Sequence, residues 1–437
     1  MAGSSSFDIL IVGGGQAATP LAFHLAKAGK KVAVAERKYL GGSCVNFGCT
    51  PTKAAIASAK VAHLARRGAD FGLRVPQVEI DFPAVIRRAA GIALESRTSL
   101  DHSFENSDNP TLLRGHARFL GPGFELQVAD TRVSAKQVVL NTGTRTAVPN
   151  IPGLDKIPFI HSGNWLEHMQ LPERLALIGG SYIGLEMAQF YRRMGTRVAV
   201  WETSPRIAMH EDEEISSAIQ QFLEQEGIEF HLNARIQSID ELNATEVFVA
   251  AGRKPNTDDL GLETIGVQTD QHGYLRVDRR LATNVAGIWV AGDARGGPQF
   301  THTSWDDYRI LMSQIAGDGS RTTDRIVPYA MFTDPELGRV GLTEREAREQ
   351  GLKFRSTKFE MKKNSKAREI GEPEGFIKML LEEGTGKILG AALLCADAAE
   401  LVHLYIDIMN AGASSTVIRD AIHIHPTLAE AVQSAVS

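Results

Sequence analysis

The segment Phe7-Asp-Ile-Leu-Ile-Val-Gly-Gly-Gly-Gln-Ala-Ala18 decides the fold of this 437-residue chain. An apolar run, predicted to be the first β-strand, enters a glycine turn; a helix-like run and a second apolar strand ending at Glu36 follow. Gly13 and Gly15 let the backbone turn tightly and approach a pyrophosphate at the start of a helix. Glu36 then stands where a carboxylate accepts ribose hydroxyls. This order predicts a dinucleotide-binding unit in which Ala18 replaces the third glycine.

The same unit occurs a second time, from Leu175-Ala-Leu-Ile-Gly-Gly-Ser-Tyr-Ile-Gly184 to the acid Glu202. The spacing from the last turn position to the acid is identical, since 36 − 18 = 18 and 202 − 184 = 18. Ser181 replaces the middle glycine, so its side chain would either crowd a pyrophosphate or hydrogen-bond to it. The repetition favours two nucleotide sites over two glycine turns without ligands.

A cysteine pair lies between the two units, in Gly41-Gly-Ser-Cys-Val-Asn-Phe-Gly-Cys-Thr-Pro-Thr-Lys53. Four residues separate Cys44 from Cys49, close enough for a disulfide across one helical turn. Thr50-Pro51 is typical of a helix start. Cys49 would then lie at a helix N-terminus with Lys53 one turn on, and both features lower the pKa of a thiol. A redox pair is favoured over a zinc half-site, which lacks further cysteine ligands, and over two inert thiols.

Composition excludes several other classes of protein. The net charge is −5 and the basic doublets are scattered, so no nucleic-acid partner is expected. The apolar stretches are too short to span a bilayer, and no basic residue precedes the first one. The third cysteine, Cys395, lies alone in the apolar run Ile388–Cys395 and is expected to be a small core residue. We expect a cytoplasmic protein of two to four domains without a membrane partner.

At this point the residues indicate a family. The segment Gly41–Lys53 closely resembles the active-site motif of class I pyridine nucleotide–disulfide oxidoreductases, which include dihydrolipoamide dehydrogenase, glutathione reductase and mercuric reductase. Val139–Arg145 and Val249–Asn256 resemble the turns that close the FAD and nicotinamide domains, and Ile288–Asp293 resembles the second FAD motif. His423–Glu430 resembles the interface motif. The resemblance covers nearly the whole chain.

The resemblance implies an α/β fold with two Rossmann-like nucleotide-binding domains and a C-terminal α+β dimerisation domain. The FAD domain would comprise residues 1–148 and 278–322, the NAD(P)H domain 149–277 and the interface domain 323–437. The segment 231–249 is shorter than the family usually shows, which predicts that a small β-meander is missing or abbreviated. A homodimer is implied.

The resemblance also implies the cofactor contacts. The expected FAD contacts are Gly13, Gly15, Ala18, Glu36, Gly42, Ser43, Lys53, Ala117, Thr142, Gly143 and Asp293. The expected NAD(P)H contacts are Gly179, Gly180, Ser181, Tyr182, Gly184, Glu202 and Gly252, with Tyr182 as an aromatic gate over the nicotinamide pocket. NADH is favoured, because a carboxylate such as Glu202 repels a 2′-phosphate. Thr203, Ser204 and Arg206 follow it directly and leave NADPH open.

The implied reaction passes electrons from NAD(P)H through FAD to a Cys44–Cys49 disulfide. Cys49 would face the flavin and Cys44 the substrate, while Lys53 and Glu186 would form an ion pair beside the flavin. In the interface motif, His425 would act as the base for Cys44 and Glu430 would orient its ring. The acidic run Glu211–Glu214 is expected only to decorate the start of a helix.

The sequence indicates a subgroup rather than a substrate. Phe300–Ile310 resembles mercuric-reductase-like flavoproteins, including copper-reducing enzymes. The last five residues, Gln433–Ser437, contain no vicinal cysteine pair, and the His425–Glu430 pair is kept, so mercury reduction is disfavoured. The expected acceptor is a metal ion, a quinone or a disulfide. The alternatives are a dihydrolipoamide dehydrogenase of 2-oxoacid dehydrogenase complexes and, third, a flavin-binding redox sensor without turnover.

Overall fold

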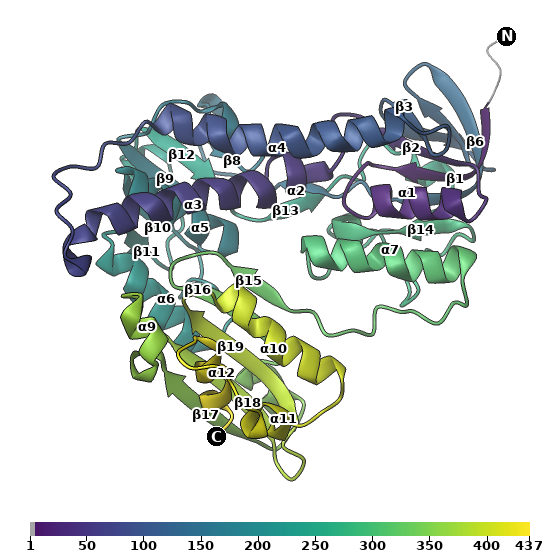
Figure 1. The fold of residues 1–437 in the computed structure, drawn as a ribbon. Helices are drawn as coiled ribbons and strands as arrows, with labels where there is room; N and C mark the ends of the chain where they lie inside the picture. The colour runs from purple at the N-terminus through teal and green to yellow at the C-terminus, as the bar shows by residue number, and fades with distance from the viewer. Residues whose placement is uncertain (1–4) are drawn as a thin grey trace.

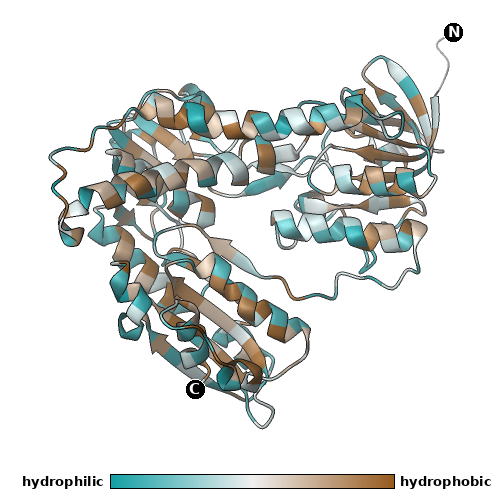
Figure 2. Ribbon diagram, viewed as in Figure 1, coloured by the Kyte–Doolittle hydropathy of each residue, from teal (hydrophilic) through white to brown (hydrophobic). Residues whose placement is uncertain are grey.

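The computed structural model describes residues 5–437, which form three main sheets and a short ribbon (Figure 1). The N-terminal sheet lies at the right of the view, the second sheet at the upper left and the C-terminal sheet below. Figure 2 shows apolar residues concentrated on the strands, most clearly in the C-terminal sheet, while apolar and polar residues alternate along the helices. The predicted fold class, two Rossmann-like units followed by a C-terminal α+β unit, is confirmed.

The first sheet has seven strands in the order β3-β2-β1-β6-β5-β4, with β14 paired to β6. All five residues of β2 are buried, as expected for a parallel strand covered on both faces. Helices α1 and α7 pack together on one side. The bounds are β1 Ser5–Val12, α1 Ala18–Lys27, β2 Val32–Glu36, β3 Thr111–Arg114, β4 Ala117–Gly121, β5 Glu125–Val128, β6 Thr131–Leu140, β14 Ile288–Val290 and α7 Thr301–Ala316.

The second sheet is parallel throughout and has the order β11-β10-β9-β12-β8. Between β11 and β12 the chain forms only a short 3₁₀ turn, so the prediction of a missing meander is confirmed. The bounds are β8 Ile160–His161, β9 Arg174–Ile178, α5 Tyr182–Met194, β10 Arg197–Trp201, α6 Glu213–Gln225, β11 Glu229–His231 and β12 Glu246–Val249.

A two-stranded ribbon and three helices connect the first two sheets. The strands β7 (Thr144–Thr146) and β13 (Arg253–Pro255) follow the two strand-end turns recognised in the sequence and pair antiparallel. The helices α2 (Gly42–Asn46) and α3 (Cys49–Arg66) run from the first sheet towards the second, and α4 (Phe82–Glu105) returns alongside α3 to the first sheet (Figure 1).

The C-terminal sheet is antiparallel, in the order β15-β16-β19-β18-β17, and α10 packs on it. Its apolar residues share one core with α3, α4 and α5, so the three units are joined by packing. Cys395 is fully buried at the end of β19, as predicted. The bounds are β15 Tyr329–Met331, β16 Glu336–Gly341, α8 Glu344–Glu349, β17 Phe354–Glu360, α9 Ser365–Glu369, β18 Phe376–Glu382, β19 Ile388–Cys395, α10 Ala398–Asn410, α11 Thr416–Asp420 and α12 Ala429–Ala435. The domain boundaries at 148, 278 and 322 remain predictions.

Candidate active site

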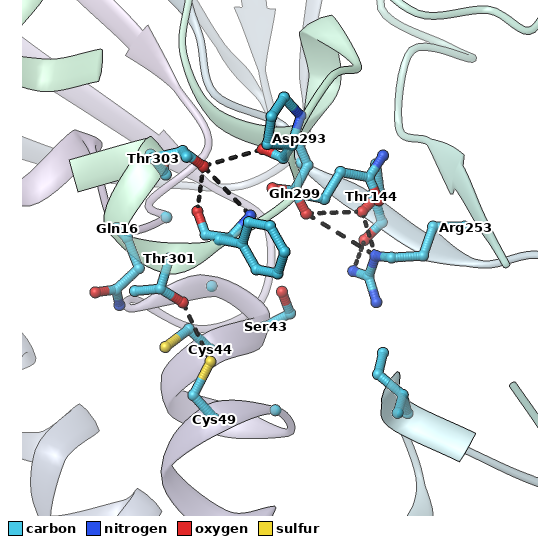
Figure 3. A pocket seen from close by; sticks show the side chains of 18 of the residues that line it. Gln16, Ser43, Cys44, Cys49, Thr144, Arg253, Asp293, Gln299, Thr301 and Thr303 are labelled. Carbon is cyan, nitrogen blue, oxygen red and sulfur yellow. Dashed lines mark hydrogen bonds and ion pairs between the residues drawn. The ribbon is translucent and has the colours of Figure 1, made fainter. Parts of the chain in front are cut away.

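One long cavity of about 2540 Å³ runs past both glycine turns and the cysteine pair. Figure 3 shows its cysteine end, where Cys44 and Cys49 lie beside Thr301 and below Asp293 and Thr144. The predicted residues that line it are Gly13, Gly15, Glu36, Gly42, Ser43, Cys44, Cys49, Lys53, Ala117, Thr142, Gly143, Gly179, Ser181, Tyr182, Glu186, Glu202, Gly252 and Asp293. Ala18, Gly180 and Gly184 are predicted contacts that do not line it. Ala18 is fully buried at the start of α1, and a Cβ at Gly184 would lie 2.1 Å from the carbonyl oxygen of Gly179.

The two cysteines lie on consecutive helices that are separated by a short break. Cys44 is in α2, and Cys49 is the first residue of α3, one residue earlier than the predicted Thr50-Pro51 start. Cys49 is exposed to the cavity, and its Sγ lies 3.1 Å from the hydroxyl of Thr301. The pKa of Cys49 is lowered to about 6, mainly by a hydrogen bond from Cys44, with Thr301 and Lys53 assisting against burial. The pKa of Cys44 is raised by that same hydrogen bond and by burial. Cys49 is therefore the thiol of the pair that ionises first.

The ion pair predicted between Lys53 and Glu186 is present, with 2.7 Å between Nζ and Oε2. The Glu186 side chain is buried, and its second oxygen accepts a hydrogen bond of 2.9 Å from the backbone N–H of Phe332. The Lys53 ammonium also lies 4.6 Å from the centre of the Phe332 ring. Three units of the fold thus fix one charge pair a single helical turn beyond Cys49.

The first glycine turn fits the pyrophosphate and ribose of FAD. Gly13 has φ +99°, and a Cβ there would lie 2.4 Å from the carbonyl oxygen of Asn141, so only glycine fits. Glu36 accepts hydrogen bonds of 2.6 Å from the N–H groups of Gly14 and Lys38. The hydroxyl of Thr142 lines the same cavity and is buried without a partner, which leaves a polar atom available to a ligand.

The second glycine turn repeats this geometry and fits a nicotinamide nucleotide. Gly179 has φ +114°, and a Cβ there would lie 2.5 Å from the carbonyl oxygen of Ala250. Glu202 accepts hydrogen bonds from the N–H groups of Gly180 (2.7 Å) and Ser204 (2.8 Å). Burial would raise the pKa of Glu202, but these donors outweigh it and the pKa is lowered. Arg206, four residues beyond Glu202, donates to the carbonyl oxygen of Glu211 at 2.8 Å.

Asp293 and Thr144 form a polar contact at the cysteine end of the cavity. The Thr144 hydroxyl donates to Asp293 at 3.0 Å and accepts from Arg253 at 2.6 Å (Figure 3). Thr144 begins β7 and Arg253 begins β13, so the interdomain ribbon orients the predicted FAD residue Asp293.

The His425–Glu430 pair forms, but neither residue lines the cavity. His425 Nδ1 lies 3.0 Å from Glu430 Oε1, and the other oxygen accepts from the N–H of Thr427 at 2.9 Å. The pKa of Glu430 is lowered, first by the Thr427 N–H and then by His425. The His425 side chain is 68% exposed and does not line the cavity that contains Cys44. The neighbouring Ile422 and Ile424 are 100% and 79% exposed.

Three residues of the site, Thr301, Tyr329 and Glu211, were not assigned to it from the sequence alone. Thr301 contacts Cys49, and Tyr182 and Tyr329 both donate to Glu211, at 3.1 and 2.6 Å. The expectation that the acidic run decorates a helix start holds for Asp212–Glu214, since Asp212 is the N-cap residue of α6 and Glu213 and Glu214 lie in its first turn, but it is wrong for Glu211, which is buried.

Comparisons with known proteins agree with this geometry. Residues 7–307 match the family model described as pyridine nucleotide-disulphide oxidoreductase, and residues 327–436 match its dimerisation domain. The chain is 32% identical to the probable pyridine nucleotide-disulfide oxidoreductase RclA of Escherichia coli, over 98% of each chain. It is also 32% identical to the mitochondrial dihydrolipoyl dehydrogenase of Pisum sativum, over 99% of this chain and 91% of that one. A solved Cu(II) complex of the HOCl-induced flavoprotein disulfide reductase RclA superimposes with a TM-score of 0.91 and 31% identity, over 99% of each chain.

The chain belongs to the pyridine nucleotide-disulphide oxidoreductase family. It is therefore an FAD-dependent enzyme that takes electrons from NAD(P)H, and it carries the family's dimerisation domain. None of the helices within residues 5–437 is long and apolar enough to cross a membrane.

Proposed function

We propose that this enzyme reduces a thiophilic metal ion, Cu(II), at the Cys44–Cys49 pair. Bound NAD(P)H and FAD supply hydride transfer and the two-electron reduction of the disulfide. The S–S bond then breaks, giving a Cys44 thiol and a Cys49 thiolate. Two Cu(II) ions each take one electron from this reduced pair, the S–S bond re-forms, and the Cys44 proton is released. Each NAD(P)H thus yields two Cu(I).

The observation that carries this proposal is the pair of adjacent thiols, one acidic, on the wall of an open cavity. A thiolate is a soft ligand, which favours Cu(I) as the product. Two solved structures of the relative RclA each cover 99% of this chain. Both are Cu(II) complexes, and one of them is of a cysteine-to-serine mutant.

The His425–Glu430 pair favours a second candidate, oxidation of a dithiol such as dihydrolipoamide or reduction of the corresponding disulfide. A histidine held by a carboxylate suits proton exchange with Cys44. Within one chain the pair lies away from Cys44 and beside exposed isoleucines. We therefore propose a homodimer in which His425 of each chain completes the partner's site.

A substrate panel tests these proposals. The purified flavoprotein is assayed for NADH and NADPH oxidation with Cu(II), Hg(II), oxidised glutathione, lipoamide and quinones, and Cu(I) is trapped with a chromogenic chelator. We expect Cu(II) to be reduced with two Cu(I) per NAD(P)H, and Cys44→Ser to abolish this. Faster turnover with lipoamide than with Cu(II) would replace the proposal by the second candidate. Flavin reduction without turnover of any acceptor would identify a sensor.

A further inference from the structure

A buried carboxylate holds the aromatic residue at the mouth of the second glycine turn. Tyr182 is the first residue of α5 and donates its hydroxyl to Glu211 Oε1 at 3.1 Å. Tyr329, from β15 of the C-terminal unit, donates to the same oxygen at 2.6 Å. The two tyrosine rings lie 5.4 Å apart. Glu211 itself is 1% exposed, so these hydroxyls are strong partners for a buried charge.

Tyr182 stands between the nucleotide turn and the cysteines. It lies one helical turn before Glu186, the partner of Lys53, and therefore on the same face of α5. Tyr329 stacks on Phe300 at 5.4 Å, and Phe300 directly precedes Thr301, which contacts Cys49. A continuous wall of side chains thus leads from Tyr182 to the reactive thiol, and all of its members line the cavity.

Glu211 has a second partner that is positioned but not engaged. Its Oε2 makes no hydrogen bond and lies 3.8 Å from Nη1 of Arg339, a residue of β16 whose Nη1 also lies 3.7 Å from Asp212 Oδ2. The Nε and Nη2 atoms of Arg339 are also buried without partners. If the Tyr182 hydroxyl leaves, a small shift of Arg339 would keep the carboxylate paired. Movement of Tyr182 therefore does not leave the buried Glu211 carboxylate without a partner.

We infer that Glu211, Tyr329 and Arg339 form a latch that keeps Tyr182 over the nicotinamide end of the cavity until the nucleotide displaces it. The inference rests on the proposed nucleotide site at the second glycine turn. Glu211 is a positioning residue, since it acts through Tyr182. A nucleotide must break the latch to place its nicotinamide ring, so the latch weakens binding of that ring and leaves the ADP-ribose part unaffected.

Calorimetric titration of the flavin-loaded enzyme tests the latch. The ligands are NAD⁺ and ADP-ribose, which differ only in the nicotinamide; if NADPH is the donor, NADP⁺ and 2′-phospho-ADP-ribose replace them. Tyr182→Phe, Tyr329→Phe and Glu211→Gln should each tighten NAD⁺ binding about 3- to 10-fold, the worth of one hydrogen bond, without changing ADP-ribose binding. Glu213→Gln, an exposed acid in the first turn of α6, should change neither.

The double variant Tyr182→Phe/Glu211→Gln should bind NAD⁺ no more tightly than either single variant, because both remove one interaction. Additive effects, equal changes for the two ligands, or unchanged or weaker NAD⁺ binding in the tyrosine variants would overturn the latch. The two tyrosine variants decide the matter even if Glu211→Gln does not fold. Wild-type enzyme that binds neither ligand would instead refute the nucleotide site itself.

Discussion

The two glycine turns hold their acids in the same way but differ in what covers them. In each, the carboxylate accepts from the N–H of a turn glycine and from the N–H two residues beyond the acid. At the first turn, however, α2 closes the opening: a Cβ at Gly42 would lie 3.0 Å from the Cα of Gly15. At the second, Ser181 is exposed. The same backbone geometry thus forms two different sites. The covered turn suits a cofactor that stays bound, and the open turn suits a nucleotide that is exchanged at every turnover.

The largest expected effect comes from matched substitutions in the two turns. Gly13→Ala and Gly179→Ala both force a Cβ against a carbonyl oxygen at positive φ, where the backbone term alone costs about 1–2 kcal/mol. We expect Gly13→Ala to purify without flavin and without activity. Gly179→Ala should keep its flavin but lose reduction by NAD(P)H. Flavin absorbance per protein and stopped-flow reduction measure both, and stoichiometric flavin in Gly13→Ala would refute the comparison.

The second-largest effect distinguishes flavin reduction by NAD(P)H, which depends on the two turns, from the thiol–disulfide chemistry at Cys44. His425→Ala should slow turnover of a disulfide substrate by about 10²- to 10⁴-fold, the usual loss for a positioned base. Reduction of the flavin by NAD(P)H should be nearly unchanged, since His425 lies outside the cavity of its own chain.

Subunit mixing tests whether His425 acts across a dimer. Cys44→Ser and His425→Ala subunits, each inactive, should recover part of the activity after exchange, because one of the two mixed sites is then wild type. Verified mixed dimers that remain inactive, or an active monomer by sedimentation, would rule out shared sites.

The third effect concerns the acid of the open turn. We expect wild-type enzyme to prefer NADH, because Glu202 is ionised and Arg206 is engaged by the carbonyl oxygen of Glu211. Glu202→Gln removes the charge and should raise the ratio of kcat/KM for NADPH over NADH by roughly tenfold or more. Glu36→Gln, the matched change in the covered turn, should leave this ratio unchanged. A wild-type preference for NADPH would show that the two acids do not have equivalent roles.

The fourth effect is a pH shift at the cysteine pair. The thiolate of Cys49 is present above its pKa of about 6 and is lost as the pH falls through that value. Thr301→Val removes a hydrogen bond to the thiolate, so this pKa should rise and the thiolate should be lost at higher pH. The charge-transfer absorbance of two-electron-reduced enzyme, followed against pH, measures the change. Thr50→Val, in the same first turn as Cys49, is the control, and an equal shift there would contradict the role of Thr301.

Most features predicted correctly from the residues alone are local, whereas those missed depend on tertiary contacts. The Lys53–Glu186 ion pair joins residues 133 apart, and it was predicted only because the family resemblance implies it. Each glycine turn, its acid and the cysteine pair lie within a few dozen residues, so spacing alone reveals them. Thr301 meets Cys49 across 252 residues, and Tyr329 meets Glu211 across 118. In the acidic run Glu211–Glu214, which spans the start of α6, the sequence alone does not distinguish buried Glu211 from exposed Glu213. The pairing of β7 with β13 was likewise hidden, because each strand has only three residues.

The smallest effect tests one chemical difference between the turns, the serine of the second at the position of Gly15 in the first. Ser181 caps α5 with extended backbone (φ −99°, ψ −178°), and its side chain makes no capping hydrogen bond. Its exposed hydroxyl is therefore available to a phosphate at the helix start. Ser181→Ala and Ser181→Gly should both weaken ADP-ribose binding about 2- to 10-fold, because both lose that hydroxyl. Tighter binding by Ser181→Gly would instead mean that the side chain crowds the pyrophosphate.

The reverse substitution completes this test. In Gly15→Ser, the added Cβ would lie 2.9 Å from the Asn141 amide nitrogen, beneath α2. The covered turn has no room for the side chain that the open turn accepts, so this variant should lose flavin while Ser181→Gly keeps it. If Gly15→Ser retained its flavin, α2 would leave more room over the first turn than the structure indicates, and the contrast between a covered and an open turn would fail.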